Sequence, residues 1–171
     1  TEIKMNYLIK DFFSFPETIN DVSARLVALF IVIITSVTIF FIMKESIIGI
    51  YFCFFLTYGF LARTLSGPKI SPIALVVTKL MVPNLGLKEK IVPGPPKRFA
   101  QSIGLVTTAI ASFCLLYNLD LISIILLAIL VIFASLESFL GFCFGCKVFK
   151  LLMHLKVIPE DVCEKCNNLE F

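Results

Sequence analysis

Residues 26–43, LVALFIVIITSVTIFFIM, decide the fold of this protein, because they form an 18-residue run without a single charge. A helix that spans a bilayer needs about 17–25 predominantly apolar residues. Further uncharged runs follow at 47–62, 99–119 and 121–136, and the last of them stays apolar past Glu137 as far as Cys146. The sequence therefore predicts four transmembrane helices, at about 26–43, 47–63, 99–119 and 121–143.

The composition agrees with a membrane protein of the all-α class. Hydrophobic residues make up 58% of the 171 residues, charged residues make up only 16%, and the mean hydropathy is +0.98. Soluble domains carry about 25% charged residues, since part of every globule must face water. The net charge of +3 gives no indication of a nucleic-acid partner. Membrane lipid is the expected surrounding.

The segments between the runs predict how the helices are connected. Lys44-Glu45-Ser46 separates the first two runs, and Asn118-Leu119-Asp120 separates the last two. Links this short predict two antiparallel helical hairpins. The expected domains are an N-terminal segment (1–25), a four-helix membrane domain (26–146) and a C-terminal tail (147–171). Four helices enclose little interior, so a homo-oligomer such as a dimer is compatible with the chain.

The distribution of Lys and Arg predicts the orientation. Four spans put the N-terminal segment, the middle segment and the tail on one side, and 14 of the 15 Lys and Arg residues lie there. Lys44 is the exception. Since positive charge accumulates in cytosolic loops, both termini and the middle segment are expected in the cytosol.

The middle segment contains a short apolar stretch between prolines. Residues 72–84 run from Pro72 past Pro83, with Lys79 as the one charge. This length is too short to span a bilayer and suits an interfacial helix. A re-entrant element lining a cavity is the alternative, since irregular backbone at membrane depth is tolerated only there.

Basic residues at the ends of the expected spans are candidates for binding an anion. Lys97 and Arg98 follow two prolines at a helix start, where they could anchor the helix at the headgroups or capture an anion such as a lipid phosphate. Arg25 and Arg63 lie at the ends of the first two spans. Each is either a surface anchor or a buried partner of Glu137.

Glu137 is an acid deep inside an apolar run. A charge there is unfavourable, so its side chain is expected to face the bundle interior and to find a partner. A structural pair with an arginine is one interpretation. A catalytic carboxylate that handles protons or contacts a substrate is the other.

The cysteines carry the clearest chemical signal. Cys143 and Cys146 form one C-x-x-C, Cys163 and Cys166 form a second, and 16 residues separate the pairs. This spacing suits four thiolates around a structural zinc ion, which would make the tail a cysteine-rich cap. Two redox-active dithiols that exchange electrons or sulfane sulfur are one alternative, and four thiols without a chemical role are the other. Because the first pair is expected to end the fourth span, and a helix C-terminus raises a thiol pKa, its position weakens the redox interpretation.

Several motifs together resemble a bacterial integral-membrane family known as domain of unknown function 4395. They are Phe15-Pro16 to Asn20, Arg25, Arg63, Gly67-Pro68, Ser71-Pro72, GPPKRFAQ (94–101), Ile103-Gly104, Leu136-Glu137 and GFCFGC (141–146). The likeness extends from about Phe15 to the end of the chain. The resemblance implies a location in the bacterial inner membrane. It also implies that Arg25, Arg63, Lys97, Arg98, Glu137, Cys143 and Cys146 belong to one cytosol-facing site.

The resemblance carries no established activity, but genes of this family often lie near those of thioredoxin-like proteins and sulfurtransferases. It therefore strengthens the thiol interpretation and implies a soluble partner of one of these classes. The resulting hypothesis is a protein that handles redox equivalents or sulfane sulfur through Cys143 and Cys146. A non-enzymatic scaffold or small-solute carrier with a zinc-bound tail is the alternative.

Overall fold

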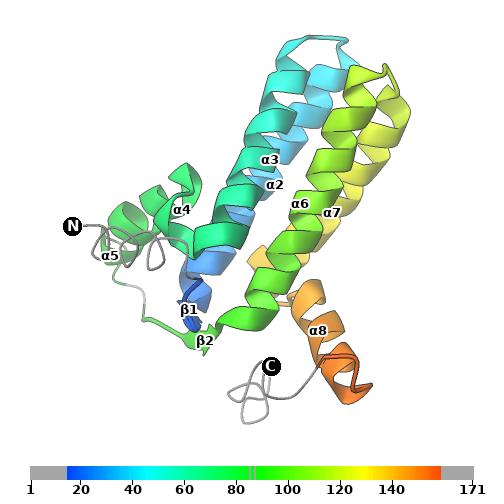
Figure 1. Ribbon diagram of the computed structural model, residues 1–171. Coiled ribbons are helices and arrows are strands. Elements are labelled where there is room, and N and C mark those ends of the chain that lie inside the picture. Colours follow the sequence, from blue (N-terminus) through cyan, green and yellow to red (C-terminus); the bar gives the residue numbers. More distant parts are fainter. Residues whose placement is uncertain (1–14, 85, 87, 159–171) are drawn as a thin grey trace, which may run out of the picture.

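The computed structural model describes residues 15–84, 86 and 88–158 and shows a helical protein (Figure 1). Its elements in chain order are β1 (Thr18–Asn20), α2 (Asp21–Met43), α3 (Ile48–Ser66), the 3-10 turn η1 (Gly67–Lys69), α4 (Pro72–Val76), the π-helical turn η2 (Val77–Met81), α5 (Val82–Asn84), β2 (Ile91–Pro93), α6 (Gly94–Leu116), α7 (Asp120–Leu140) and α8 (Phe144–His154).

Four helical stretches of the described chain are long and apolar enough to cross a membrane. They are Asp21–Met43, Ile48–Asn84, Gly94–Leu116 and Asp120–Leu140, of which the second joins α3 to the short helices after it. The chain is thus a multi-pass membrane protein by length and composition. Large apolar side chains lie exposed along these helices, such as Phe113 at 60% and Leu121 at 71%. A bilayer would cover them.

The four long helices lie side by side (Figure 1). α2 packs against α7 and α3, and α6 packs against α3 and α7. Small polar residues lie where the helices meet: Thr108 and Ser123 are fully buried, and the Ser123 hydroxyl donates to the Ala111 carbonyl at 2.9 Å. Such residues let membrane helices approach closely and satisfy their own hydroxyls. The α2–α3 and α6–α7 turns lie at the same end of the bundle.

A short two-stranded ribbon holds the opposite end together. β1 and β2 pair antiparallel, with Ile19 opposite Val92. The Asp21 N–H donates to the Lys90 carbonyl at 2.7 Å where the ribbon enters α2. The Asn20 side chain caps α2 by accepting from the Val22 N–H at 3.0 Å, and the helix therefore begins five residues before the predicted span. The ribbon places the first turns of α2 and α6 next to each other.

The end of the fourth long helix corrects the prediction for the first cysteine pair. α7 ends at Leu140, because Gly141 adopts a left-handed conformation with φ of 67°. The predicted span to residue 143 is too long by three residues. Helix α8 then begins at Phe144 with Cys143 as its N-cap residue. Cys143 and Cys146 thus begin a helix, and the prediction that they follow one is wrong.

Residues 72–84, expected as one short helix, are helical in three pieces. α4, η2 and α5 follow one another without a gap, and the π-helical turn of η2 interrupts the α-helical hydrogen bonding. Val77 is fully buried, and the segment packs against α2 and α3.

Candidate functional site

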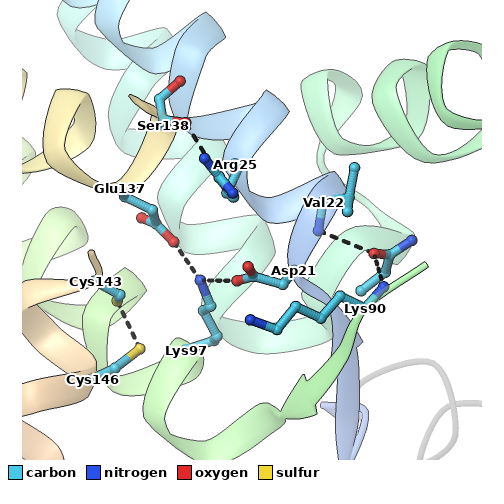
Figure 2. Close-up of polar contacts among 10 residues, drawn as sticks. Asp21, Val22, Arg25, Lys90, Lys97, Glu137, Ser138, Cys143 and Cys146 are labelled. Carbon is cyan, nitrogen blue, oxygen red and sulfur yellow. Dashed lines mark hydrogen bonds and ion pairs between the residues drawn. The ribbon is translucent and has the colours of Figure 1, made fainter. Parts of the chain in front are cut away.

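A buried ion cluster joins three of the long helices at the ribbon end of the bundle (Figure 2). Lys97, the fourth residue of α6, is 6% exposed. Its Nζ lies 3.0 Å from Asp21 Oδ1 of α2 and 2.7 Å from Glu137 Oε1 of α7. Charges removed from water need such partners, because an isolated one is strongly unfavourable.

This cluster corrects two expectations. The direct partner of Glu137 is Lys97, although an arginine was the partner considered from the sequence. Helices α6 and α7 pack against each other, and the start of α6 lies beside the end of α7. Lys97 was expected at the headgroups or on a bound anion, but its ammonium already lies between two carboxylates. Asp21 was not among the site residues expected from the sequence. A second acceptor beside Asn20 at the start of an apolar helix was the available signal.

Arg63 lies in the interior of the bundle. It is 2% exposed, its Nη1 donates to Ser71 Oγ at 3.4 Å, and its guanidinium carbon lies 4.5 Å from the centre of the Phe60 ring. Its Nη2 has no hydrogen-bond partner among the described residues. The interpretation of Arg63 as a surface anchor is therefore wrong.

Arg25 and Arg98 hold backbone carbonyls. Arg25 Nε donates to the Ser138 carbonyl at 3.3 Å, and its Nη2 donates to the Phe139 carbonyl at 3.1 Å. These bonds satisfy the last turn of α7 and suit its negative dipole end. Arg98 Nε donates to the Thr64 carbonyl at 3.0 Å. Both residues join helices within the structure.

The Cys143–Cys146 pair lies beside the ion cluster (Figure 2). Both thiols are free, Cys143 is 9% exposed, and the Cys146 Sγ donates to the Cys143 Sγ at 2.7 Å. A C-x-x-C at the start of a helix is the arrangement of redox-active dithiols, since the positive end of the helix dipole favours a thiolate. The expectation that a helix C-terminus raises the pKa of these thiols therefore does not apply, and the helix dipole favours a redox role instead.

The two thiols differ in acidity. The pKa of Cys143 is lowered, chiefly by the hydrogen bond from Cys146 and further by the Lys97 ammonium, although burial and the Glu137 carboxylate oppose this. The pKa of Cys146 is raised, because its proton is held by Cys143 and because it is buried. Cys143 is thus the more acidic thiol of the pair.

This difference predicts distinct pH profiles for alkylation by iodoacetamide. An ordinary thiol has a pKa of about 8.5 and loses about tenfold in rate for each pH unit below it. Cys143 is expected to keep its rate below pH 8.5 and to slow only below its own lowered pKa. Cys146 should react slowly throughout, because it stays protonated. Timed alkylation followed by peptide mass spectrometry measures both, with the denatured chain as control. Identical profiles in the folded protein would contradict the assignment.

Two cavities meet at this site. The larger, about 350 Å³, lies among α2, α3, α6 and α7, and its lining includes Arg63, Glu137, Lys97 and Cys143. The smaller, about 190 Å³, is lined by Lys97, Cys143 and Cys146 among others. Lys97 and Cys143 border both cavities.

The metal interpretation depends on residues outside the described part of the chain. Cys163 and Cys166, the other expected zinc ligands, lie there. Within 15–84, 86 and 88–158 no three Cys, His, Asp or Glu residues are grouped so that they could hold a metal ion. Cys143 and Cys146 could supply two thiolates of a four-cysteine site.

Comparison with known proteins places the chain in a family. The model of the family described as Domain of unknown function (DUF4395) matches residues 19–154. Neither the curated proteins nor the solved structures contain a significant match to the chain. The matched range covers the ribbon, the four long helices, the ion cluster and the first C-x-x-C, and it confirms the resemblance drawn from the motifs. The protein belongs to the DUF4395 family.

Proposed function

We propose that the protein transfers thiol-redox equivalents or sulfane sulfur through the Cys143–Cys146 dithiol. The observation that carries this proposal is the position of the pair: Cys143 is the N-cap residue of α8, is hydrogen-bonded to Cys146, and lies in the electrostatic field of the Lys97 ammonium. These are the conditions under which a cysteine becomes a nucleophile.

The chemistry is exchange with a soluble partner that is a thioredoxin-like protein or a sulfurtransferase. A thiolate of the partner attacks the Cys143–Cys146 disulfide, a mixed disulfide forms, and the second partner thiol releases it. The partner leaves oxidised and the pair is reduced by two electrons. In sulfur transfer, the Cys143 thiolate attacks the outer sulfur of a partner persulfide, and the partner leaves as a thiolate. In the reduction, the two protons of the partner dithiol pass to the Cys143 and Cys146 sulfurs.

The proposed location is the cytosolic face of the bacterial inner membrane. Arg63, Lys97 and Lys147 lie at the site, whereas Lys44 lies in the turn after α2. The positive-inside rule then makes the site end cytosolic, with the long helices as two antiparallel hairpins. In this proposal residues 72–84 lie at the interface, and Cys163 and Cys166 of the tail exchange electrons or sulfur with the first pair as a relay.

Purified protein with its dithiol oxidised tests the proposal. Reduced bacterial thioredoxin, regenerated by its reductase and NADPH, is expected to reduce the Cys143–Cys146 pair, as counted by alkylation and mass spectrometry. Cys143→Ser should abolish the reaction. Cys114→Ser is the matched control, because Cys114 lies in α6 away from the pair, and its reduction rate should be unchanged.

Two results would contradict the proposal. One is a pair that neither thioredoxin nor a persulfide donor can modify. The other is stoichiometric zinc in the purified protein, with all four tail and α8 thiols protected from alkylation until a chelator is added. The second result would favour a zinc-locked scaffold or solute carrier.

A further inference from the structure

Part of the lining of the larger cavity belongs to the apolar surface that a bilayer would cover. Its lining includes Ile103 of α6, Ile129 of α7 and Phe144 of α8, which are 37%, 41% and 42% exposed. Apolar side chains exposed on membrane helices contact lipid, so a ligand entering between them comes from the bilayer. The volume of about 350 Å³ falls within the roughly 300–1,000 Å³ of small-molecule sites. The expected occupant is a lipophilic small molecule.

Unpartnered polar atoms in the lining favour an occupant that carries hydrogen-bonding groups. Arg63 Nη2 and Gln101 Oε1 both belong to lining residues, and neither has a hydrogen-bond partner among the described residues. Arg63 is 2% exposed. A buried donor without an acceptor is unfavourable. A ligand carbonyl inside the cavity would satisfy the arginine N–H.

The charges around the cavity favour a neutral ligand. The two buried cations, Arg63 and Lys97, are balanced in number by two carboxylates, Asp21 and Glu137. An anionic ligand such as a fatty acid would bring a further buried negative charge without a partner. Lys69, which also borders the cavity, is exposed. A neutral molecule with a carbonyl group brings no further charge into the cavity and offers an acceptor to the Arg63 N–H.

We propose that this cavity binds the head group of a membrane quinone, which oxidises the Cys143–Cys146 dithiol. A sulfur–sulfur bond forms between the two cysteines. Their two electrons and two protons pass to the quinone, whose two carbonyls become the hydroxyls of a quinol. Since Cys143 borders both cavities, a soluble thiol partner can supply electrons from the smaller one while quinone removes them in the larger. This inference rests on the proposed thiol function and names its electron acceptor.

The test uses the full chain in nanodiscs, with its thiols reduced and the reductant removed. The probe is a short-chain benzoquinone with a fully substituted ring, so that a thiol cannot add to a free ring position. We expect one quinol for each protein, measured by the loss of quinone absorbance, together with loss of two alkylatable thiols at Cys143 and Cys146. Cys143→Ser should form no quinol.

Two substitutions test the cavity itself. Arg63→Lys keeps the charge but removes the guanidinium N–H, and it should raise the half-saturating quinone concentration about tenfold, as expected for one lost hydrogen bond. Ala134→Leu fills the cavity and should have at least the same effect. Ala109→Leu is the matched control, because Ala109 of α6 is exposed and outside the lining. Oxidation by the water-soluble reagent diamide should be equal in all of them.

The outcomes separate this inference from the function it rests on. A dithiol that reacts with thioredoxin but forms no quinol overturns the quinone site alone. Quinol formation that Arg63→Lys and Ala134→Leu leave unchanged also overturns it, since the reaction then takes place elsewhere. A dithiol that neither thioredoxin, a persulfide donor nor quinone modifies overturns both proposals.

Discussion

Replacing Lys97 by Met is expected to lower the free energy of unfolding by about 3–5 kcal/mol, the cost of leaving a buried charge without its partner. Lys97 Nζ is held between Asp21 and Glu137, whose side chains are 12% and 22% exposed. Without the ammonium, two carboxylates from different helices face each other in a poorly hydrated place. The helices α2, α6 and α7 would then be held together less firmly at the ribbon end.

Thermal unfolding in detergent measures this effect. For a chain of this size each kcal/mol corresponds to about 2–4 °C, so the melting temperature should fall by about 6–20 °C. Lys150→Met, at an exposed position of α8, is the matched control. Adding Asp21→Asn and Glu137→Gln to Lys97→Met should restore part of the loss, since the uncompensated charges are then gone. A melting temperature equal to that of Lys150→Met would contradict the role of the cluster.

Gly145→Ala is expected to move α8 away from α6 and to slow the thiol chemistry. A Cβ at Gly145 would lie 2.6 Å from both the Cα and the Cβ of Ala100, closer than real carbon atoms pack. The Ala100 Cα belongs to the backbone of α6, so the helices must separate, at a cost of about 1–3 kcal/mol for overpacking. Cys143 and Cys146 lie at the start of α8 and would move with it.

The alkylation rate of Cys143 and the melting temperature together measure this change. Gly59→Ala is the control, because the nearest atom to its new Cβ is Arg63 Nη1 at an ordinary 3.7 Å. Ala100→Gly introduced into the Gly145→Ala protein should recover part of both losses, since it removes one of the two close contacts. If Gly145→Ala reacts and melts like Gly59→Ala, α8 is not held against α6 as described.

The position of the first cysteine pair was predicted wrongly, because the long apolar run was given more weight than the single glycine within it. The apolar run past Glu137 predicted a continuous helix to residue 143. Gly141 carried the contrary signal, because a glycine after an apolar helix often ends it in a left-handed conformation. Because α7 ends at Leu140, Cys143 becomes the N-cap residue of a new helix, α8. A thiol at a helix start is stabilised as a thiolate, whereas the same thiol at a helix end is not.

The sequence by itself determined the membrane class and the four apolar helices, because in lipid each backbone group must bond within its own helix and hydropathy alone then marks the spans. The family followed from short motifs, each of which can be recognised in the sequence without knowing the fold. Only the tertiary structure decided the partners within the site. Lys97 and Glu137 are 40 residues apart, and a ribbon of three-residue strands, too short to be predicted from their composition, brings Asp21 to them. Such contacts depend on how the elements pack in space, which no local pattern records.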